Sequence, residues 1–466
     1  MLWDSGRIDS RDQCSVPYAG PRLAPGGSYV WRVRVWSPDG PVSPWAGPAR
    51  FGLGLRDEDW EASWIARPPE DEPDRRDRYT LARRELVVPS DRVRALMYVA
   101  SFHQHELRID GRTVRRGPAF AYPDEGYYQA ADVTAWLRPG ARAVLAVVTH
   151  WYGPGQGRPE ARPGLLVRLV VERAGGERLV VVSDGSWRVR RGPWRPAPYR
   201  NGDGRDYVEH MDARAEPVGW DRPAFADAGW REPEVLGRHP TAVFTRLQGL
   251  DVDLSHATIA PVSTTPTGNG GILADFGRVV AAAPVVRFRA GSAGREIAMV
   301  AGYVVEGGEV SRTAGTQETD LSYGYVQRDG EQTFRAFDHL GFRYFQVDDP
   351  GESLDSGAIA AVEQHTDVDR SQAATFSCSD DTLTAVFDLA MRSALVCAQW
   401  QFLDTPTREK GQFLADAVNL SRALMGGYRD RALTRKAILE FVASQRRYWP
   451  DGRLNAVYPN GDGRRD

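Results

Sequence analysis

The strongest constraint on the fold of this chain is a long series of strand signals between residues 78 and about 365. Short apolar runs rich in valine, leucine and aromatic residues recur there, separated by glycine-containing turns. From residue 78 to about residue 240 no helical period of useful length interrupts them. Runs of this kind predict strands that bury one or both faces. The sequence therefore predicts that most of the chain is built from β-sheets.

Turn signals divide the strands into hairpins and units. Asp110 and Gly111 separate "HELRI" from the next strand, and Gly175 and Gly176 separate "LLVRLVV" from "RLVVVS". Both pairs are typical of tight β-hairpin turns. We expect one all-β unit from about residue 78 to 240, and a third β-rich unit from "ILADFG" to about residue 365.

A shorter β-module precedes them. "YVWRVRVW" at residues 29–36 alternates with period two, and "SPDG" supplies a turn. Only about fifty residues precede Trp60, whereas a seven-stranded sandwich needs about a hundred. We therefore expect a sandwich whose first strands are missing. The proline-rich and charged stretch "RPPEDEPDRRD" at residues 67–77 is predicted to be a loop or linker.

After Ser379 the period of the sequence changes to that of a helix. Apolar residues follow at helical spacing, and Ser379 and two aspartates are placed to cap the helix. The residues of this apolar stripe are Leu383, Val386, Phe387, Ala390, Met391, Ala394 and Leu395. We predict two further helices, over residues 413–425, ended by Gly426 and Gly427, and over residues 432–444. These helices carry an apolar face that they cannot all bury by themselves.

Composition excludes several classes of protein. A chain of 466 residues is too long for one core and suggests about three or four units. Its net charge of −3 provides no basic surplus for nucleic acid. No stretch is apolar enough to cross a membrane, and no signal peptide is visible, so we expect a cytoplasmic protein. Three widely spaced cysteines, Cys14, Cys378 and Cys397, are expected to be free buried thiols.

The weaker candidate sites predict no metal and no cofactor. His103 and His105 share a strand face but have no third ligand at a recognisable spacing, so they are interpreted as surface or packing histidines. Acidic residues at 199–214 could bind calcium or a sugar, although a solvated turn is preferred. Most tryptophans, such as Trp31 and Trp187, are expected in the core. Trp400 is a candidate for sugar stacking because it lies four residues before Asp404.

The segment "DTPTREKGQFLAD" at residues 404–416 concentrates charge where a helix is expected. If the following helix extended backward, Glu409 and Asp416 would project in line, two turns apart, although Gly411 opposes this. Asp404 or Thr405 could simply cap a helix, and the other acids could be solvated and paired with Arg408 or Lys410. Alternatively, the acids line a sugar pocket, since glycoside hydrolysis needs one protonated and one ionised carboxyl group. Spacing alone favours the solvated interpretation.

The same segment resembles the active-site signature of the bacterial α-L-rhamnosidases, glycoside hydrolase family 78, which reads Asp-x-Pro-x-Arg-Glu-Lys-Gly-Gln-x-x-x-Asp in one branch. "YVWRVRVWSPDG", "HELRIDGRTV", "DHLGFRYFQV" and "YPNGDGRRD" resemble other parts of these proteins. The resemblance implies a multidomain fold of three all-β modules followed by the first helices of an (α/α)6 barrel. The implied domains are a partial fibronectin type III-like module (1–55), a jelly-roll (60–240), a concanavalin-like β-sandwich (245–365) and the beginning of the catalytic barrel (370–466).

The resemblance also implies site roles. Glu409 would be the general acid, and Asp404, Arg408 and Asp416 would hold hydroxyls of a terminal α-L-rhamnose in a rhamnose-containing glycoside or oligosaccharide. The commoner branch has a tryptophan in this region that is absent here, where Phe413 follows Gln412, so the resemblance does not establish the aromatic wall of the sugar site.

The inverting mechanism of the family takes its base from a glutamate late in the barrel. We therefore expect a fragment truncated at both ends and inactive by itself. The alternative is a noncatalytic carbohydrate-binding protein of several modules.

Overall fold

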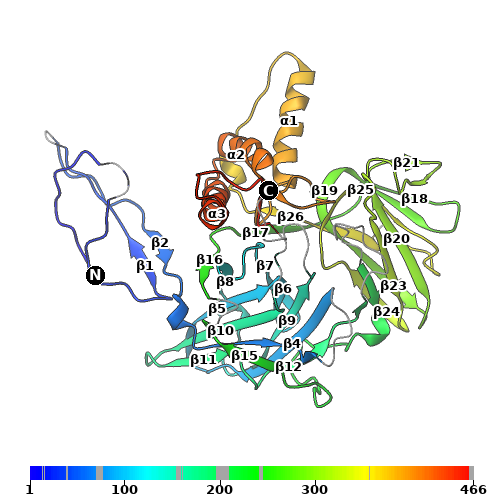
Figure 1. Ribbon diagram of the computed structural model, residues 1–466, viewed down its shortest axis with the longest axis horizontal. Helices are drawn as coiled ribbons and strands as arrows, with labels where there is room; N and C mark the ends of the chain where they lie inside the picture. Colours follow the sequence, from blue (N-terminus) through cyan, green and yellow to red (C-terminus); the bar gives the residue numbers. More distant parts are fainter. Residues whose placement is uncertain are drawn as a thin grey trace.

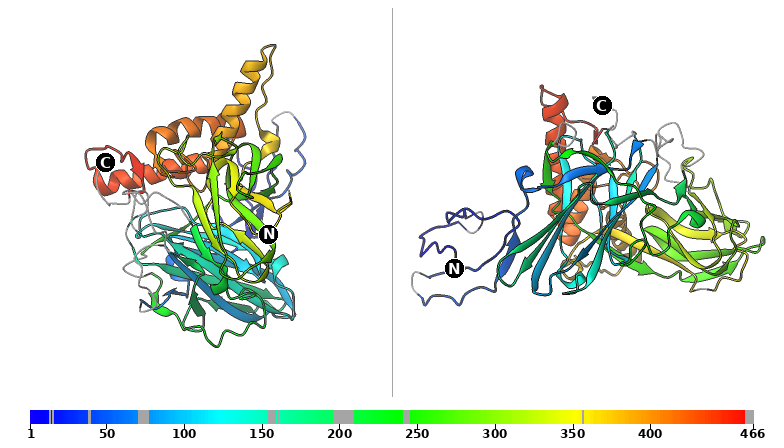
Figure 2. Two further views of the ribbon diagram at one scale, coloured as in Figure 1. Left: turned by 90° about the vertical axis from the view of Figure 1, so that its right-hand side faces the viewer. Right: turned by 90° about the horizontal axis from the view of Figure 1, so that it is seen from below.

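The computed structural model describes residues 1–466 except 13, 15, 38–39, 70–76, 154–158, 160, 196–208, 241–244, 356 and 461–466. A small N-terminal ribbon projects from one side of the molecule (Figure 1). Two large β-units lie next to each other, and three helices cover one end of them (Figures 1 and 2). The molecule is thus mostly β, with several units, as predicted.

The N-terminal ribbon consists of β1 (Ser28–Trp31) and β2 (Ala49–Gly52), which pair antiparallel. Trp36 pairs with Val42 only as an isolated bridge, so the predicted strand ends early. Trp31 is 54% exposed, and its predicted place in the core is wrong. The reason is that two strands form a single layer, which leaves both faces of the ribbon without the second sheet that buries a tryptophan in a sandwich.

The second unit is a sandwich of a seven-stranded and a five-stranded sheet. The seven strands are β3 (Ser63–Ala66), β5 (Arg92–Phe102), β8 (Gly126–Asp132), β10 (Gly164–Arg173), β11 (Arg178–Val182), β15 (Glu234–Arg238) and β16 (Leu247–Gly249). The five strands are β4 (Arg78–Val87), β6 (Gln104–Ile109), β7 (Arg112–Gly117), β9 (Arg142–Trp151) and β12 (Arg188–Arg191). Val99, Leu145 and Val167 pack between the sheets with Trp187, whose predicted burial is confirmed.

Both predicted hairpins are present. β6 and β7 flank Asp110 and Gly111, which have φ values of 47° and 75°. Positive φ at both central residues matches the twist of a two-residue hairpin. β10 and β11 pair across the second turn, where Gly176 has φ 84°.

The third unit is dominated by a ten-stranded sheet. Its strands are β13 (Trp194–Arg195), β14 (Glu209–Asp212), β17 (Leu254–Ile259), β18 (Ser263–Pro266), β19 (Ile272–Gly291), β20 (Glu296–Gly302), β23 (Ser322–Val326), β24 (Gly330–Arg335), β25 (Leu340–Val347) and β26 (Ile359–Thr366). A hairpin of β21 (Val305–Glu306) and β22 (Glu309–Val310) precedes β23. β14 runs parallel to β23, so residues that follow the sandwich in sequence join this sheet.

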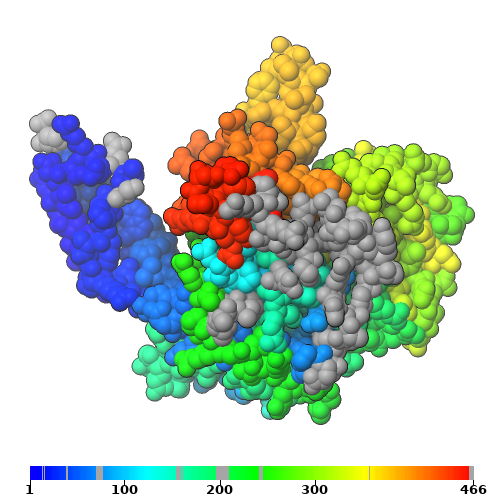
Figure 3. Space-filling model, viewed as in Figure 1, coloured from blue at the N-terminus to red at the C-terminus, as the bar shows by residue number. Residues whose placement is uncertain are grey.

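The three helices are α1 (Asp381–Val396), α2 (Leu414–Tyr428) and α3 (Ala432–Tyr448). Asp380 caps α1 through the amides of Thr382 and Leu383. α1 stands clear of the rest of the surface (Figures 1 and 3), and its apolar residues Leu383, Val386 and Leu389 are 53%, 55% and 56% exposed. The predicted excess of apolar helix surface is confirmed.

The predicted end of the second helix is wrong. α2 continues through Gly426 and Gly427 and ends where Arg429 turns left-handed, with φ 57°. Gly427 lies against α1, where a Cβ atom would approach the sulfur of Met391 to 2.4 Å. This glycine therefore permits close helix packing. At its other end, α2 is preceded by the short strand β27 (Gln412–Phe413), paired with β28 (Val457–Tyr458), so the helix does not extend back to Glu409.

Two further findings complete the fold. Cys14 and Cys378 are exposed and Cys397 is half-buried, so the expectation of buried thiols is wrong for the first two, which lie in irregular segments.

In the part of the chain that the structure describes, none of the helices has the length and apolar character needed to span a bilayer.

Candidate active site

Residues 404–411 form a closed loop between α1 and α2, called the acid loop below. The Asp404 amide donates to the carbonyl of Gly411 at 3.0 Å, and the Gly411 amide donates to Oδ1 of Asp404 at 3.0 Å. Inside the loop, Oγ1 of Thr405 accepts from the amides of Thr407 and Arg408 at 3.4 and 3.2 Å. Asp404 and Thr405 therefore hold a turn and do not cap a helix.

The acid loop is docked on the beginning of β25. The Gly341 amide donates to the carbonyl of Pro406 at 3.1 Å, and the Thr407 hydroxyl donates back to the carbonyl of Gly341 at 3.4 Å. The Tyr303 hydroxyl also hydrogen-bonds that of Thr407. A Cβ atom on Gly341 would lie 2.5 Å from Cγ of Pro406. Because the rigid ring of Pro406 lies so close to this backbone, the position has no room for a Cβ atom and favours glycine.

Lys410 fixes the other end of the loop. It has a left-handed φ of 52°, and its buried Nζ donates to the carbonyl of His339 at 2.5 Å. The ammonium group also acts on the neighbouring Asp338. Burial opposes ionisation of Asp338, but the hydrogen bond from His150 and the charge of Lys410 lower its pKa below the usual range. Lys410 thus joins the acid loop to a buried charge.

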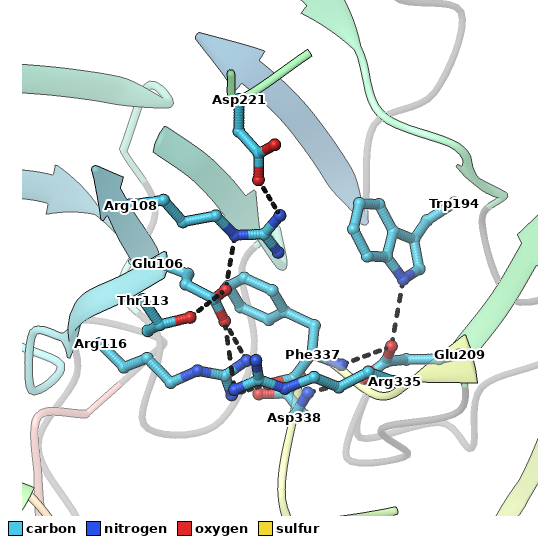
Figure 4. A network of polar contacts seen from close by, with 10 residues as sticks. All are labelled: Glu106, Arg108, Thr113, Arg116, Trp194, Glu209, Asp221, Arg335, Phe337 and Asp338. Atoms are coloured by element: carbon cyan, nitrogen blue, oxygen red, sulfur yellow. Dashed lines mark hydrogen bonds and ion pairs between the residues drawn. The ribbon is translucent and has the colours of Figure 1, made fainter. Parts of the chain in front are cut away.

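A network of ionic contacts holds the segment that Lys410 reaches (Figure 4). Arg116 pairs with Glu106 of the sandwich and donates through Nη1 to the carbonyl of Phe337 at 2.8 Å. From the other side, the carboxylate of Glu209 accepts from the amides of Phe337 and Asp338 at 2.8 and 2.7 Å. Burial and the charge of Asp338 raise the pKa of Glu209 to about 7. Residues 337–339 are therefore held between the two β-units.

Two acid side chains meet inside the acid loop. The carboxyl groups of Asp404 and Glu409 are hydrogen-bonded, and burial together with this contact raises the pKa of Asp404 to about 7. Nη1 of Arg408 lies 2.6 Å from Oε1 of Glu409. The side chains of Glu409 and Arg408 are 13% and 26% exposed, so both reach the surface. Asp404 can therefore hold a proton near neutral pH, beside a carboxyl group that a ligand can reach.

Asp416 lies in the first turn of α2, where the helix dipole favours a carboxylate. Burial raises the pKa of the Cys397 thiol to about 11, and the charges of Asp404 and Asp416 contribute to this rise. Both aspartates therefore lie near Cys397, at the end of α1. The structure brings Asp404, Arg408 and Glu409 into direct contact and places Asp416 beside them.

Other candidates from the sequence lie in the interior. Trp400 is only 7% exposed, and its indole donates to the carbonyl of Arg116 at 3.1 Å, so it does not offer a stacking face. His103 and His105 are buried, so of the two interpretations packing is confirmed and a surface position is wrong; His105 contacts the Ser101 hydroxyl at 2.8 Å. Of the acidic stretch at 199–214, residues 199–208 lie outside the described residues, and Asp212 is paired with Arg195 and Arg214. Within the described ranges, no three potential metal ligands lie together.

Sequence reasoning missed three residues that support the site. Tyr303 and His339 hold the acid loop, and Oε1 of Gln317 accepts from Nε of Arg408 at 3.2 Å. All three come from the ten-stranded unit, between 71 and 104 positions away in sequence from their partners. No local pattern could have predicted these contacts.

Three family profiles match this chain. Residues 1–57 match the Rha78A-like N-terminal immunoglobulin domain, residues 91–251 the α-L-rhamnosidase N-terminal domain, and residues 265–364 the bacterial α-L-rhamnosidase concanavalin-like domain. An α-L-rhamnosidase from Formosa agariphila is 24% identical over 464 residues, which cover 89% of this chain and 47% of the relative. An α-L-rhamnosidase from Streptomyces avermitilis is 28% identical over 261 residues, which cover 50% of this chain and 22% of the relative.

Solved structures show the same fold. The chain is similar to an α-L-rhamnosidase from Dictyoglumus thermophilum, with a TM-score of 0.84 and 21% identity, over 99% of this chain and 53% of that one. The enzyme from Aspergillus terreus has a TM-score of 0.81 and 25% identity, and the match covers 97% of this chain and 53% of that one. The Streptomyces avermitilis enzyme complexed with L-rhamnose has a TM-score of 0.75 and 19% identity, and the match covers 99% of this chain and 62% of that one. The chain spans about half the length of these proteins.

Proposed function

Because the chain belongs to the bacterial α-L-rhamnosidases of glycoside hydrolase family 78, we propose that its acid loop supplies the general acid of a hydrolase that removes terminal α-L-rhamnose. The observation that carries this proposal is the hydrogen-bonded carboxyl pair of Asp404 and Glu409, with the pKa of Asp404 raised to about 7. A glycosidase needs a carboxylic acid that is still protonated near neutral pH.

In this proposal Glu409 donates the proton to the leaving oxygen. Asp404, whose pKa is raised to about 7 by burial and by the contact with Glu409, holds the proton that Glu409 donates. Arg408, which now pairs with Glu409, turns its guanidinium to a rhamnose hydroxyl when the sugar enters. That movement takes the guanidinium away from the acid pair, and the proton of Asp404 passes to Glu409 as the substrate binds. Asp404 and Asp416 then accept hydrogen bonds from further hydroxyls.

We assign the N-terminal ribbon to a fibronectin type III-like module, the second unit to a jelly-roll, and α1, α2 and α3 to an (α/α)6 barrel. The exposed apolar side chains on α1 support the last assignment, since barrel helices pack on neighbours along their length. The domain boundaries predicted above remain predictions.

We place the general base outside these 466 residues. An inverting enzyme needs a second carboxylate about 6.5–9.5 Å from the acid, with a water between them. The family takes it from a late barrel helix, and the chain spans 53% of two of the solved enzymes that it resembles. The reaction then proceeds by attack of water on the anomeric carbon, proton transfer from Glu409 to the leaving oxygen, and inversion of configuration.

The alternative is a noncatalytic carbohydrate-binding protein. The test uses the extended protein, defined as these residues followed by the rest of the barrel, with an aryl α-L-rhamnoside as substrate. We expect hydrolysis by the extended protein, a large loss on Glu409→Gln, and no hydrolysis by the 466 residues alone. Binding of L-rhamnose without turnover would favour the carbohydrate-binding alternative. Equal turnover by wild type and Glu409→Gln would remove Glu409 from the acid role.

A further inference from the structure

The acid loop has a neighbour that the proposed mechanism does not use. Residues 311–321 connect β22 to β23 in the ten-stranded unit, and within them Gln317 is exposed. Its Oε1 accepts from Nε of Arg408 at 3.2 Å, while Nη1 of the same guanidinium lies 2.6 Å from Glu409. The Arg408 side chain therefore links Gln317 to the proposed acid, Glu409. We propose that Gln317 contacts the leaving group of the substrate and that residues 316–319 form a binding site for a hydroxyl-bearing leaving group, that is, a second sugar.

The conformation of this segment is unusual. Gln317 and Glu318 are consecutive non-glycine residues with left-handed φ values of 51° and 65°. This region is sparsely populated for residues with a Cβ atom, and such residues occur preferentially at functional sites. The strained turn projects the Gln317 side chain toward Arg408.

The strained turn is anchored on both sides. Thr316 and Thr319 are only 3% and 2% exposed, and the Thr319 amide donates to the carbonyl of Thr316 at 3.1 Å. Before them, Gly315 packs on Tyr303, and Tyr303 bonds Thr407 of the acid loop. The segment and the acid loop thus share a support, which fixes Gln317 relative to Glu409.

The position of Gln317 indicates the leaving-group side. This step rests on the proposed function, in which Glu409 protonates the oxygen between rhamnose and its leaving group. Asp404 contacts Glu409 and lies with Asp416 near Cys397, in the helical part that would enclose rhamnose. Gln317 comes from the β-unit and contacts Arg408, which pairs with Glu409. A sugar held by the two aspartates therefore directs its substituent toward the β-unit.

The chemistry of the segment favours a sugar over a flat aromatic group. Between residues 312 and 320 the exposed positions are glycine or polar, and the aromatic Tyr303 beneath them is half-buried. An amide side chain both donates to and accepts from hydroxyls, which fits the ring of a second sugar. A planar aglycone would instead require an exposed apolar or aromatic surface.

The test compares two substrates in the extended protein. Gln317→Ala keeps a Cβ atom and hence the same backbone strain, and its melting temperature is measured to check the fold. Arg312→Ala is the matched control, since Arg312 lies on the same segment but pairs with Asp348 at 3.3 Å. We expect Gln317→Ala to lower kcat/KM roughly ten-fold for a rhamnosyl disaccharide, the effect of one lost hydrogen bond, and less than about three-fold for an aryl rhamnoside.

Each other outcome has a distinct meaning. Equal losses on both substrates would show that Gln317 acts only by holding Arg408, and would overturn the leaving-group assignment while leaving the proposed function intact. No loss on either substrate would also overturn it. If the wild-type extended protein hydrolyses neither rhamnoside, the proposed function fails and this inference fails with it.

Discussion

The carboxyl groups of Asp404 and Glu409 are hydrogen-bonded in a loop that three contacts attach to β25 and its preceding segment. The loop is held by Gly341 in the middle and by Lys410 at its end. The acid pair therefore has a fixed place relative to the β-units, although it belongs to the helical part of the chain. This arrangement has consequences for stability as well as for chemistry.

The raised pKa of Asp404 predicts a pH-dependent stability. Its pKa is 3.8 ordinarily and about 7 in the folded chain. Between these values the unfolded chain has lost a proton that the folded chain keeps, so this group's stabilisation is complete below pH 4 and declines until about pH 7. Asp404→Asn abolishes the decline. Relative to wild type, we expect the variant to gain on the order of 2–4 kcal/mol between pH 4 and pH 8, measured by urea denaturation.

Asp388→Asn on the exposed part of α1 is the control for this comparison. A difference between wild type and Asp404→Asn that stays the same at both pH values would show that Asp404 is ionised throughout, and that the pair holds no proton.

Lys410 is predicted to be essential for the stability of the acid loop. Lys410→Met keeps the length of the side chain but removes the donor to the His339 carbonyl and the cation beside Asp338. Leaving a buried acceptor and a buried carboxylate without this partner costs roughly 2–4 kcal/mol. We expect this loss in denaturant unfolding of the 466-residue chain. Arg446→Met, at an exposed position of α3, is the matched control, and an equal effect of both changes would contradict the assigned role.

The same substitution is predicted to have unequal effects at the adjacent glycines of α2, Gly426 and Gly427. Gly426→Ala adds a methyl group in open space, and the better helix propensity stabilises the chain by about 1 kcal/mol. Gly427→Ala gains the same propensity, but its Cβ atom would lie 2.4 Å from the Met391 sulfur, so the end of the Met391 side chain has to move aside. The cost of this movement offsets part of the gain, so we expect Gly427→Ala to be less stabilising than Gly426→Ala. Thermal unfolding of both variants gives the comparison; equal stabilisation would mean that α1 and α2 are not packed as described.

These glycines also show where sequence reasoning reached its limit. Strands and hairpins could be predicted because the alternation and the turn residues are local, as at Asp110 and Gly111. The end of α2 could not, because Gly427 serves a contact with Met391 on another helix. Trp31 was misplaced for the same reason, since burial depends on what packs over a strand and not on the strand's own pattern.

At the candidate active site, too, local features could be predicted and long-range contacts could not. The motif identified the acid loop and the family, but spacing could not tell whether Glu409 lies on a helix or in a loop. Glu409 lies in a loop because residues 412 and 413 pair as β27 with β28. The partner residues, Val457 and Tyr458, are remote from the motif in sequence. Lys410 is part of the motif, yet its role depends on His339, and Gln317 has no motif at all. Long-range partners of this kind were not accessible from one sequence.

The general-acid role of Glu409 is tested most directly by how the loss of kcat/KM in Glu409→Gln depends on the leaving group. In the extended protein, kcat/KM is measured for wild type and Glu409→Gln with a dinitrophenyl rhamnoside and with a rhamnosyl disaccharide. Glu331→Gln, at an exposed position of β24, is the control. Dinitrophenolate leaves without a proton, whereas a sugar alkoxide requires one. We predict a loss of about 10²- to 10⁴-fold for the disaccharide and a loss of less than about ten-fold for the dinitrophenyl rhamnoside. Equal losses on both substrates would contradict proton donation by Glu409.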